Sequence, residues 1–346
     1  MRVGVIGLGF GAHVHVPALR ACPNVEVVAI AGSTAEHAAA AAARLGIANA
    51  CGGYRELLAR DDLDAVTTAL PSAANGEALA LALARRLPVL SEKPVSPAGT
   101  TTAKLAAAAS GITTAVDFMF AELETFKCLR ALLRAGELGK IHSVHVTWTA
   151  QSYAQRNRQW SWKTDARNGG GVLSMLGSHM VFLVEWLLGP IEIVSVESSN
   201  DTTVGFAPPG AISAEDTVRL SLRAAGGFAI EALLSNSDAG ASIHRWTVEG
   251  EAATAVLENA SADYVAGFRL TRQALGAAAE LLHEERAAAG DNRLAAVQSL
   301  MRRFVDGARA GTPVKPDLTV AARIDHVLDD IRAQARSTAM PRAKAR

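Results

Sequence analysis

A glycine-rich turn lies directly after the first apolar run of the chain, residues 3–6. The turn reads Gly7-Leu8-Gly9-Phe10-Gly11-Ala12 and matches the G-x-G-x-x-G/A pattern of dinucleotide-binding βαβ units. In this pattern Gly7 allows the tight turn, Gly9 lets the backbone approach a pyrophosphate, and Ala12 permits close helix–strand packing. The motif alone is a weak signal, but here it opens an alternating strand–helix pattern. We therefore predict that this segment binds NAD or NADP.

The first third of the chain alternates short apolar runs with helical segments. Such alternation is typical of βαβ units, in which helices cover a parallel sheet. We predict an α/β fold for residues 1–121, a Rossmann domain with a doubly wound parallel sheet. Its strands are expected at residues 3–6, 25–31, 64–70, 88–90 and 113–118. The run Ser33-Thr34-Ala35-Glu36 matches a capping box and predicts the start of a helix.

Residues 122–346 follow a different pattern, with alternating apolar and polar residues at 141–150, 191–198, 217–223, 228–234, 243–248 and 252–257. This alternation predicts an α+β domain with a mainly antiparallel open sheet, followed by helices at 292–310 and 317–336. We assign this domain to substrate binding and oligomerisation. Helices are expected to cover one face of the sheet. The other face, at Val144, Val146 and Trp148 or their neighbours, is expected to meet another subunit in a homodimer or homotetramer. The tail from Met340 is expected to fray.

The charge balance excludes several classes of partner. The chain has 34 basic and 34 acidic side chains, so it lacks the excess positive charge of proteins that bind nucleic acids or anionic membranes. The alanine-rich stretch at residues 78–84 is too short to span a bilayer. Three cysteines, Cys22, Cys51 and Cys128, fit neither a disulfide framework nor a metal site. We expect a cytoplasmic protein with reduced thiols, a small-molecule substrate and no metal.

The residues about twenty positions beyond the glycine turn bear on the choice between NAD and NADP. An acidic residue at the end of the second strand ordinarily bonds the adenosine ribose hydroxyls. Here the position holds Gly32-Ser33-Thr34, and small hydroxyl residues with backbone amides suit a 2′-phosphate that an acid would repel. We therefore favour NADP over NAD, with His37 as the only nearby candidate cation. The alternative is that Ser33 and Thr34 only cap the next helix.

Motifs along nearly the whole chain resemble one family of enzymes. The N-terminal half contributes GLGFGAHVHVPAL at residues 7–19, DAVTTAL at 64–70 and SEKP at 91–94. The C-terminal half contributes GELGKI at residues 136–141, GGGVL at 169–173, GSH at 177–179 and WLLG at 186–189. In this order and spacing the motifs resemble the glucose–fructose oxidoreductase, inositol dehydrogenase and rhizopine catabolism (Gfo/Idh/MocA) family of NAD(P)-dependent oxidoreductases. The resemblance implies reversible oxidation of a secondary alcohol on a sugar, amino sugar or cyclitol.

The resemblance implies two groups for proton transfer. Lys93 matches the family lysine beside the substrate hydroxyl and the nicotinamide, where an amine gives or takes a proton. His179 matches the family's catalytic histidine and is expected to be its partner or a substrate anchor. The alternatives are a surface lysine in a turn and a histidine buried in the core. His15 also matches a family histidine, which we interpret as structural or cofactor-adjacent.

The remaining site residues are expectations of the same kind. Glu92 resembles the family residue near the nicotinamide ribose, although it could simply pair with Lys93. The expected cofactor-binding residues are Gly7, Gly9, Phe10, Gly11, Ala12, Gly32, Ser33, Thr34, Leu70, Pro71, Asn75, Glu92 and Lys93. The expected substrate-binding residues are Lys93, Asp117, Trp162, Lys163, Asp165, Met175 and His179.

The chain departs from the family pattern at three positions. Met175 stands where many members carry an aspartate one helical turn before the histidine, Phe182 replaces a second aspartate, and Asn75 replaces a common histidine. Methionine cannot hold a histidine tautomer, so other groups complete the proton relay or the chemistry differs. The polar loop at residues 153–168 offers substitutes, although a solvated surface loop explains each of its residues equally well. Two alternative functions stay open: a cofactor-binding sensor without turnover and an NAD-dependent glycoside hydrolase.

Overall fold

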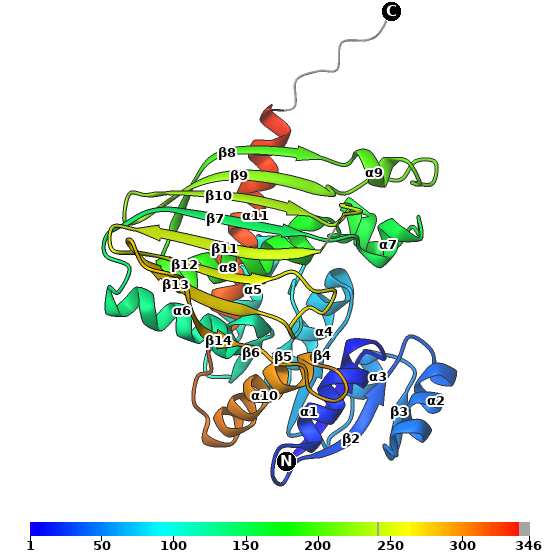
Figure 1. Ribbon diagram of the computed structural model, residues 1–346. Coiled ribbons are helices and arrows are strands. Elements are labelled where there is room, and N and C mark those ends of the chain that lie inside the picture. Colours follow the sequence, from blue (N-terminus) through cyan, green and yellow to red (C-terminus); the bar gives the residue numbers. More distant parts are fainter. Residues whose placement is uncertain (241, 339–346) are drawn as a thin grey trace, which may run out of the picture. The chain divides into compact units, whose positions relative to one another are not determined.

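The computed structural model of the chain describes residues 1–240 and 242–338. These residues form two compact units, which we describe separately. The first comprises Met1–Glu122 and Ala288–Asp325, and the second comprises Leu123–Ala287 and the chain after Asp325. Each unit has its own sheet (Figure 1). The tail from Met340, for which we expected fraying, lies outside the described residues.

The sheet of the first unit has six strands in the order β3-β2-β1-β4-β5-β6 (Figure 1). Every neighbouring pair is parallel, which confirms the predicted Rossmann sheet. The order reverses between β1 and β4, and doubly wound sheets bind their ligands at such a switch point. The sequence pattern missed β3, which has only three residues. The strands are β1 Arg2–Ile6, β2 Glu26–Ala31, β3 Asn49–Cys51, β4 Ala65–Thr68, β5 Val89–Ser91 and β6 Thr114–Val116.

Short helices connect these strands. The alanine-rich α2 is a strong helix former, and it ends where Gly46 adopts a left-handed conformation with φ of 61°. Its N-cap is Thr34, whose Oγ1 accepts a hydrogen bond from the His37 amide at 3.2 Å. The expected capping box between Ser33 and Glu36 is therefore wrong, because the helix begins one residue later. The helical segments are the π-helical turn η1 Gly11–His15, α1 Val16–Arg20, α2 Ala35–Leu45, α3 Tyr54–Leu58, α4 Ser72–Ala84, α5 Gly99–Ala108 and the 3-10 turn η2 Met119–Glu122.

A later part of the chain returns to the first unit. We expected residues 288–325 in the second domain, but helix α10 (Arg293–Ala310) packs against α1 and η2. The Arg303 guanidinium pairs with Glu122, and the Ser299 hydroxyl donates to the same carboxylate at 2.8 Å. Arg309 donates to the carbonyl oxygen of Pro23 at 2.7 Å. These contacts join residues 177 to 286 positions apart in the sequence, which no local pattern could predict.

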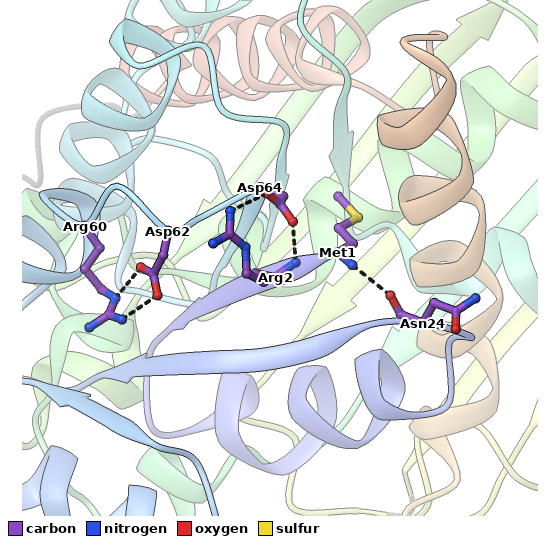
Figure 2. A network of polar contacts seen from close by, with 6 residues as sticks. All are labelled: Met1, Arg2, Asn24, Arg60, Asp62 and Asp64. Carbon is purple, nitrogen blue, oxygen red and sulfur yellow. Dashed lines mark hydrogen bonds and ion pairs between the residues drawn. The ribbon is translucent and has the colours of Figure 1, made fainter.

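The amino end of β1 is held by polar contacts on both sides (Figure 2). The Arg2 amide donates to Oδ2 of Asp64 at 2.7 Å and its guanidinium to Oδ1 at 3.1 Å, and these bonds lower the pKa of Asp64. The terminal ammonium of Met1 donates to the carbonyl oxygen of Asn24 at 2.8 Å. These bonds lie at the end of the sheet opposite the glycine turn. They anchor β1 between its neighbours without occupying the carboxyl edge.

The sheet of the second unit has eight strands in the order β14-β13-β12-β11-β7-β10-β9-β8 (Figure 1). All pairs are antiparallel except β7 with β10, which confirms a mainly antiparallel sheet. The sequence pattern missed β13 and β14 at one edge. The strands are β7 Ile141–Thr149, β8 Ile191–Ser199, β9 Thr217–Ala224, β10 Ala229–Ser235, β11 Ile243–Gly250, β12 Ala253–Asn259, β13 Arg269–Ala274 and β14 Glu280–Glu284.

Several helical segments belong to the second unit. Helix α6 packs along β12, β13 and β14 and against α8, and it ends at Gly136, whose φ is 69°. Helix α11 begins before Asp325 in the first unit and continues into the second. The helical segments are α6 Glu124–Ala135, α7 Tyr153–Arg156, η3 Trp162–Thr164, η4 Ala166–Asn168, η5 Leu173–Gly177, α8 Ser178–Leu188, α9 Asp201–Val204 and α11 Leu318–Thr338.

The two faces of β7 correct one expectation about oligomerisation. Val144, Val146 and Trp148 are at most 3% exposed, so they belong to the core of this unit and offer no surface to another subunit. Strand residues alternate between faces, so the opposite face of β7 carries His145 and Thr147. The apolar face is covered by the unit's own chain. A homodimer or homotetramer through the other, more polar face stays a prediction.

One stretch among the described residues, Ala166–Leu188, is long and apolar enough to cross a membrane. However, 78% of its most apolar window is buried inside the protein. Core helices pass such a test of length and composition as readily as membrane spans do. We interpret this stretch as part of the core of the second unit.

Replacement of Gly250 by alanine is expected to destabilise the protein by about 2 kcal/mol or more. A Cβ at Gly250 would lie 2.1 Å from the carbonyl oxygen of Leu138, and backbone cannot rotate away as a flexible side chain can. The matched control is Gly53→Ala, because a Cβ there meets nothing within 4 Å. Thermal unfolding of both variants checks this. Equal unfolding midpoints would show that the close approach of Leu138 does not constrain residue 250.

Candidate active site

The glycine turn after β1 has the geometry that a dinucleotide needs. Gly7 has φ of 117°, and a Cβ there would lie 2.3 Å from the carbonyl oxygen of Ala69. Gly11 packs closely, because its Cβ would lie 3.2 Å from Cγ1 of Val5. By contrast, a Cβ at Gly9 would meet nothing within 4 Å. The turn is thus tight on its inner side and open at Gly9, where a pyrophosphate can approach the backbone.

Three ionisable side chains of the first unit lie together near the carboxyl ends of its strands. His15 ends η1, Glu92 follows β5 and Asp117 follows β6. One nitrogen or oxygen atom from each lies within 4.8 Å of the other two, and Nε2 of His15 is 3.6 Å from Oε1 of Glu92. His15 and Asp117 are at most 1% exposed, and the Glu92 side chain is 17% exposed. We call these residues the His15–Glu92–Asp117 cluster.

Burial controls the protonation of this cluster. It lowers the pKa of His15 to about 4, so the imidazole is neutral at neutral pH. Burial also raises the pKa of Glu92, an effect opposed by the neighbouring Asp117 carboxyl and by the charge of Lys93. The pKa of Asp117 is raised well above its ordinary value, first by burial and then by the charge of Glu92. Burial likewise keeps a carboxyl protonated in lysozyme, and the charge of a neighbouring carboxylate does so in aspartic proteases.

The loop after β5 carries Lys93 and is held by Asn75 of α4. The Asn75 side chain is fully buried, and its Nδ2 donates to Oγ of Ser91 at 2.9 Å and to the carbonyl oxygen of Val95 at 3.1 Å. The peptide bond between Lys93 and Pro94 is cis. The amide nitrogen of Asn75, which replaces a common family histidine, therefore positions this loop. The expected contact of Asn75 with the cofactor stays a prediction. The expected cofactor contacts of Leu70 and Pro71, which directly precede α4, also stay predictions.

In the second unit, His179 lies near the start of α8 against a buried aromatic group. Its ring centroid is 6.1 Å from that of Trp148. Trp148 in turn stacks on His244 with centroids 3.8 Å apart and planes within 8°. Nε1 of Trp246 donates to Nε2 of His244 at 2.9 Å, and burial lowers the pKa of His244 to about 3. His244 is thus a neutral core histidine, and the stack gives His179 a rigid wall.

Glu215 and Arg332 hold the segment that precedes His179. The sequence pattern pointed to neither residue. Oε1 of Glu215 accepts from the Leu173 amide at 3.2 Å and lies 3.8 Å from Nη2 of Arg332. Arg332 of α11 also donates to Oγ of Ser174 at 2.7 Å. A Cβ at Gly171 would lie 2.4 Å from Glu215, which explains this glycine. Glu215 and Arg332 are distant in sequence from residues 171–174, so only tertiary structure reveals them.

In the loop at residues 153–168, one of the expected substrate-binding residues, Asp165, forms hydrogen bonds within the loop itself. The carboxylate of Asp165 accepts from the Arg167 amide at 2.9 Å and from Nδ2 of Asn168 at 3.0 Å. These bonds cap the short turn η4, so they support a structural role for Asp165. Nζ of Lys163 lies 5.9 Å from the centre of the Trp162 ring. Substrate contacts of these three residues stay predictions.

The sequence matches two family models in the order that the motifs predicted. Residues 1–118 match the oxidoreductase family with an NAD-binding Rossmann fold, and residues 126–256 match the GFO/IDH/MocA C-terminal domain. An uncharacterised oxidoreductase of Synechocystis sp. is 30% identical over 286 residues, which cover 80% of this chain and 76% of that protein. The chain belongs to the Gfo/Idh/MocA family. It is therefore an NAD(P)-dependent oxidoreductase of the class that acts on CH–OH groups, as the resemblance implied.

Solved structures of other Gfo/Idh/MocA-like chains share this fold at low sequence identity. A levoglucosan dehydrogenase in complex with NADH has a TM-score of 0.84 at 20% identity, and the match covers 97% of both chains. A 3-ketoreductase from Actinomadura kijaniata in complex with NADP and TDP-benzene has a TM-score of 0.80 at 22% identity, over 96% of this chain and 97% of that one. The two neighbours hold different dinucleotides. They therefore leave the NADP preference of this family member as a prediction.

The structure brings together only part of the expected site. Lys93 directly follows Glu92, and Asp117 joins Glu92 and His15 in one cluster of the first unit. Met175 lies in η5 and His179 in α8 of the second unit. The expected nucleotide residues Gly32, Ser33 and Thr34 lie at the carboxyl end of β2. Their contacts with cofactor and substrate stay predictions.

We expect Gly9→Ala to weaken binding of the reduced dinucleotide at least about tenfold without changing the unfolding midpoint. The added methyl group meets no protein atom within 4 Å, so its only effect is on a ligand that approaches the backbone. Fluorescence titration with NADPH and NADH measures the affinity, and Gly53→Ala is again the control. Unchanged affinity in the Gly9 variant would contradict the pyrophosphate site.

Proposed function

We propose that the protein interconverts a secondary alcohol and a ketone on a sugar, amino sugar or cyclitol. One observation carries the proposal: Lys93 follows a largely buried acid at the carboxyl end of β5, near the switch point of a dinucleotide-binding sheet. Ligands of open α/β sheets bind at this edge. The family resemblance of the SEKP motif supports the same role.

In both directions this reaction transfers a proton as well as a hydride. The bound nicotinamide supplies or accepts the hydride at its C4 position. Lys93 would take the hydroxyl proton during oxidation and return it during reduction, and its positive charge would stabilise an alkoxide. Glu92 would favour the charged form of this amine, because opposite charges nearby stabilise each other. His179 would bind the substrate or share in proton transfer.

Lys93→Ala is expected to lower turnover by about two to four orders of magnitude, as for loss of a general acid–base group. The assay follows the absorbance of reduced nicotinamide with a panel of sugars and cyclitols, on the intact chain. Lys104→Ala is the matched control, because Lys104 is an exposed lysine of the same unit. The same loss in both variants would contradict a specific role for Lys93.

The same assay separates the alternative functions. Cofactor binding without turnover on any substrate would indicate a sensor. Release of an aglycone without net change of the cofactor would indicate a glycoside hydrolase. Net reduction of the cofactor that depends on Lys93 supports the oxidoreductase proposal.

We further propose NADP as the preferred cofactor, with Gly32, Ser33 and Thr34 at the 2′-phosphate. The Thr34 hydroxyl already caps α2, whereas Ser33 is exposed beside it, and no acid ends β2. Ser33→Asp should therefore weaken NADPH binding at least about tenfold by charge repulsion and leave NADH binding unchanged or improved. Ser33→Ala is the control for loss of the hydroxyl alone. Equal loss of both dinucleotides in the aspartate variant would contradict a phosphate at this position.

A further inference from the structure

The His15–Glu92–Asp117 cluster has polar atoms that the described residues do not satisfy. Neither ring nitrogen of His15 and neither carboxylate oxygen of Asp117 has a hydrogen-bond partner among them. Both residues are at most 1% exposed. Buried polar groups without partners are rare because each costs free energy, so such a group calls for a ligand or a proton.

A proton satisfies this cluster best. Two carboxylates this close cannot both ionise in a buried place, because each charge opposes the other. A proton on one carboxyl supplies the donor that the other lacks, since ionised carboxylates only accept hydrogen bonds. The two groups therefore share one proton in the free protein, and His15 beside them is neutral.

The charges that surround the pair favour this proton on Asp117. Glu92 faces the cations Lys93 and Arg293, and both lower its pKa. Arg293 reaches this edge from α10, where its guanidinium lies 5.2 Å from the centre of the Phe10 ring. Asp117 instead faces Glu92 and, more weakly, Glu122, and these acids raise its pKa against a smaller effect of His15. These charges favour the anion on Glu92 and the shared proton on Asp117.

The cluster also lies beyond the switch point, in the half of a doubly wound sheet where the nicotinamide is expected. In a doubly wound sheet the glycine turn and the end of β2 bind the pyrophosphate and the adenosine ribose. The strands beyond the switch point, here β4, β5 and β6, form the other half. Glu92 and Asp117 follow β5 and β6. An oxidised nicotinamide carries one positive charge that the reduced ring lacks, and a positive charge nearby favours loss of a carboxyl proton.

We propose that the Glu92–Asp117 pair releases its proton when the oxidised dinucleotide binds and keeps it when the reduced dinucleotide binds. The O–H bond of Asp117 breaks, the electron pair stays on the carboxylate and the proton passes to solvent, with no change in oxidation state. The proposal rests on the nicotinamide cofactor of the proposed function but not on any substrate. The pair would make this protein discriminate between the two redox states of its cofactor in a pH-dependent way.

Isothermal titration calorimetry tests this with the intact, substrate-free protein. NADP⁺ and NADPH are titrated in buffers of different ionisation enthalpy, whose comparison counts the protons released. Binding of the oxidised form should release up to about one proton more than binding of the reduced form. The dissociation constant of the oxidised form should therefore fall by up to about tenfold for each unit by which the pH rises. The 2′-phosphate is common to both ligands, so its own protonation cancels in the difference.

Variants assign the proton to the pair. Asp117→Asn should abolish the difference in proton release between the two ligands, and Glu92→Gln should do so as well if the asparagine variant does not fold. Asp64→Asn is the matched control, because Asp64 is a carboxylate at the opposite end of the same sheet (Figure 2). The control should release as much proton as the wild type. Equal release by both ligands, or release that persists in the Asp117 and Glu92 variants, overturns the proposal.

Stability gives a readout without cofactor. The raised pKa of Asp117 stabilises the folded protein at low pH, and this contribution is lost as pH rises through that pKa. The unfolding midpoint of the wild type should therefore fall relative to that of Asp117→Asn as pH rises above about 4, the ordinary pKa of an aspartate. A parallel dependence in both proteins contradicts a shared proton.

Two further outcomes identify the source of a failure. If neither dinucleotide binds, the proposed function itself is overturned, whereas binding without differential proton release overturns only the proton proposal. Titrations with and without EDTA exclude a metal ion at the three side chains. A proton count that changes with EDTA would show that a metal takes the place of the proton and would overturn the proposal.

Discussion

The tight turn at Gly7 determines where the functional groups of the first unit can lie. Its amide donates to the carbonyl oxygen of Ala31 at 3.0 Å, and its missing Cβ lets the carbonyl oxygen of Ala69 approach. The chain therefore leaves β1 between the carboxyl ends of β2 and β4. The following helical turn then starts at this edge and brings His15 to Glu92 and Asp117. One backbone conformation that favours glycine thus places the nucleotide turn and the ionisable cluster on the same side of the sheet.

The fold could be predicted wherever the sequence pattern is local and long. Period-two alternation located β7 to β12, and the glycine turn located the parallel sheet. The pattern failed for β3, which has three residues, and for β13 and β14, whose edge position leaves residues such as Leu281 exposed. It also misplaced α10, because helical periodicity shows that a helix forms but not which domain its apolar face contacts.

The site could be predicted less completely, because motifs name residues one at a time. The sequence pointed to Glu92, Lys93 and Asp117 at strand ends, and the structure shows that Glu92 and Asp117 lie beside His15. It gave no sign of the pair formed by Glu215 and Arg332, since these residues stand far apart in the chain. The protonation states of these residues could not be predicted from the sequence, because they depend on burial and on the sum of neighbouring charges.

Because Met175 replaces a family aspartate, the proposed proton transfer needs other ionisable groups. Between Leu173 and Phe182 the sequence holds one ionisable side chain, His179, where many family members add two aspartates. Glu215 does not replace them, because its oxygen already holds the Leu173 amide and faces Arg332. The first unit instead has a carboxyl pair with a neutral histidine, and Lys93 directly follows Glu92, one acid of this pair. The loss of acids from one segment and the buried acids in the other unit are therefore consistent with proton transfer that depends mainly on the dinucleotide-binding unit.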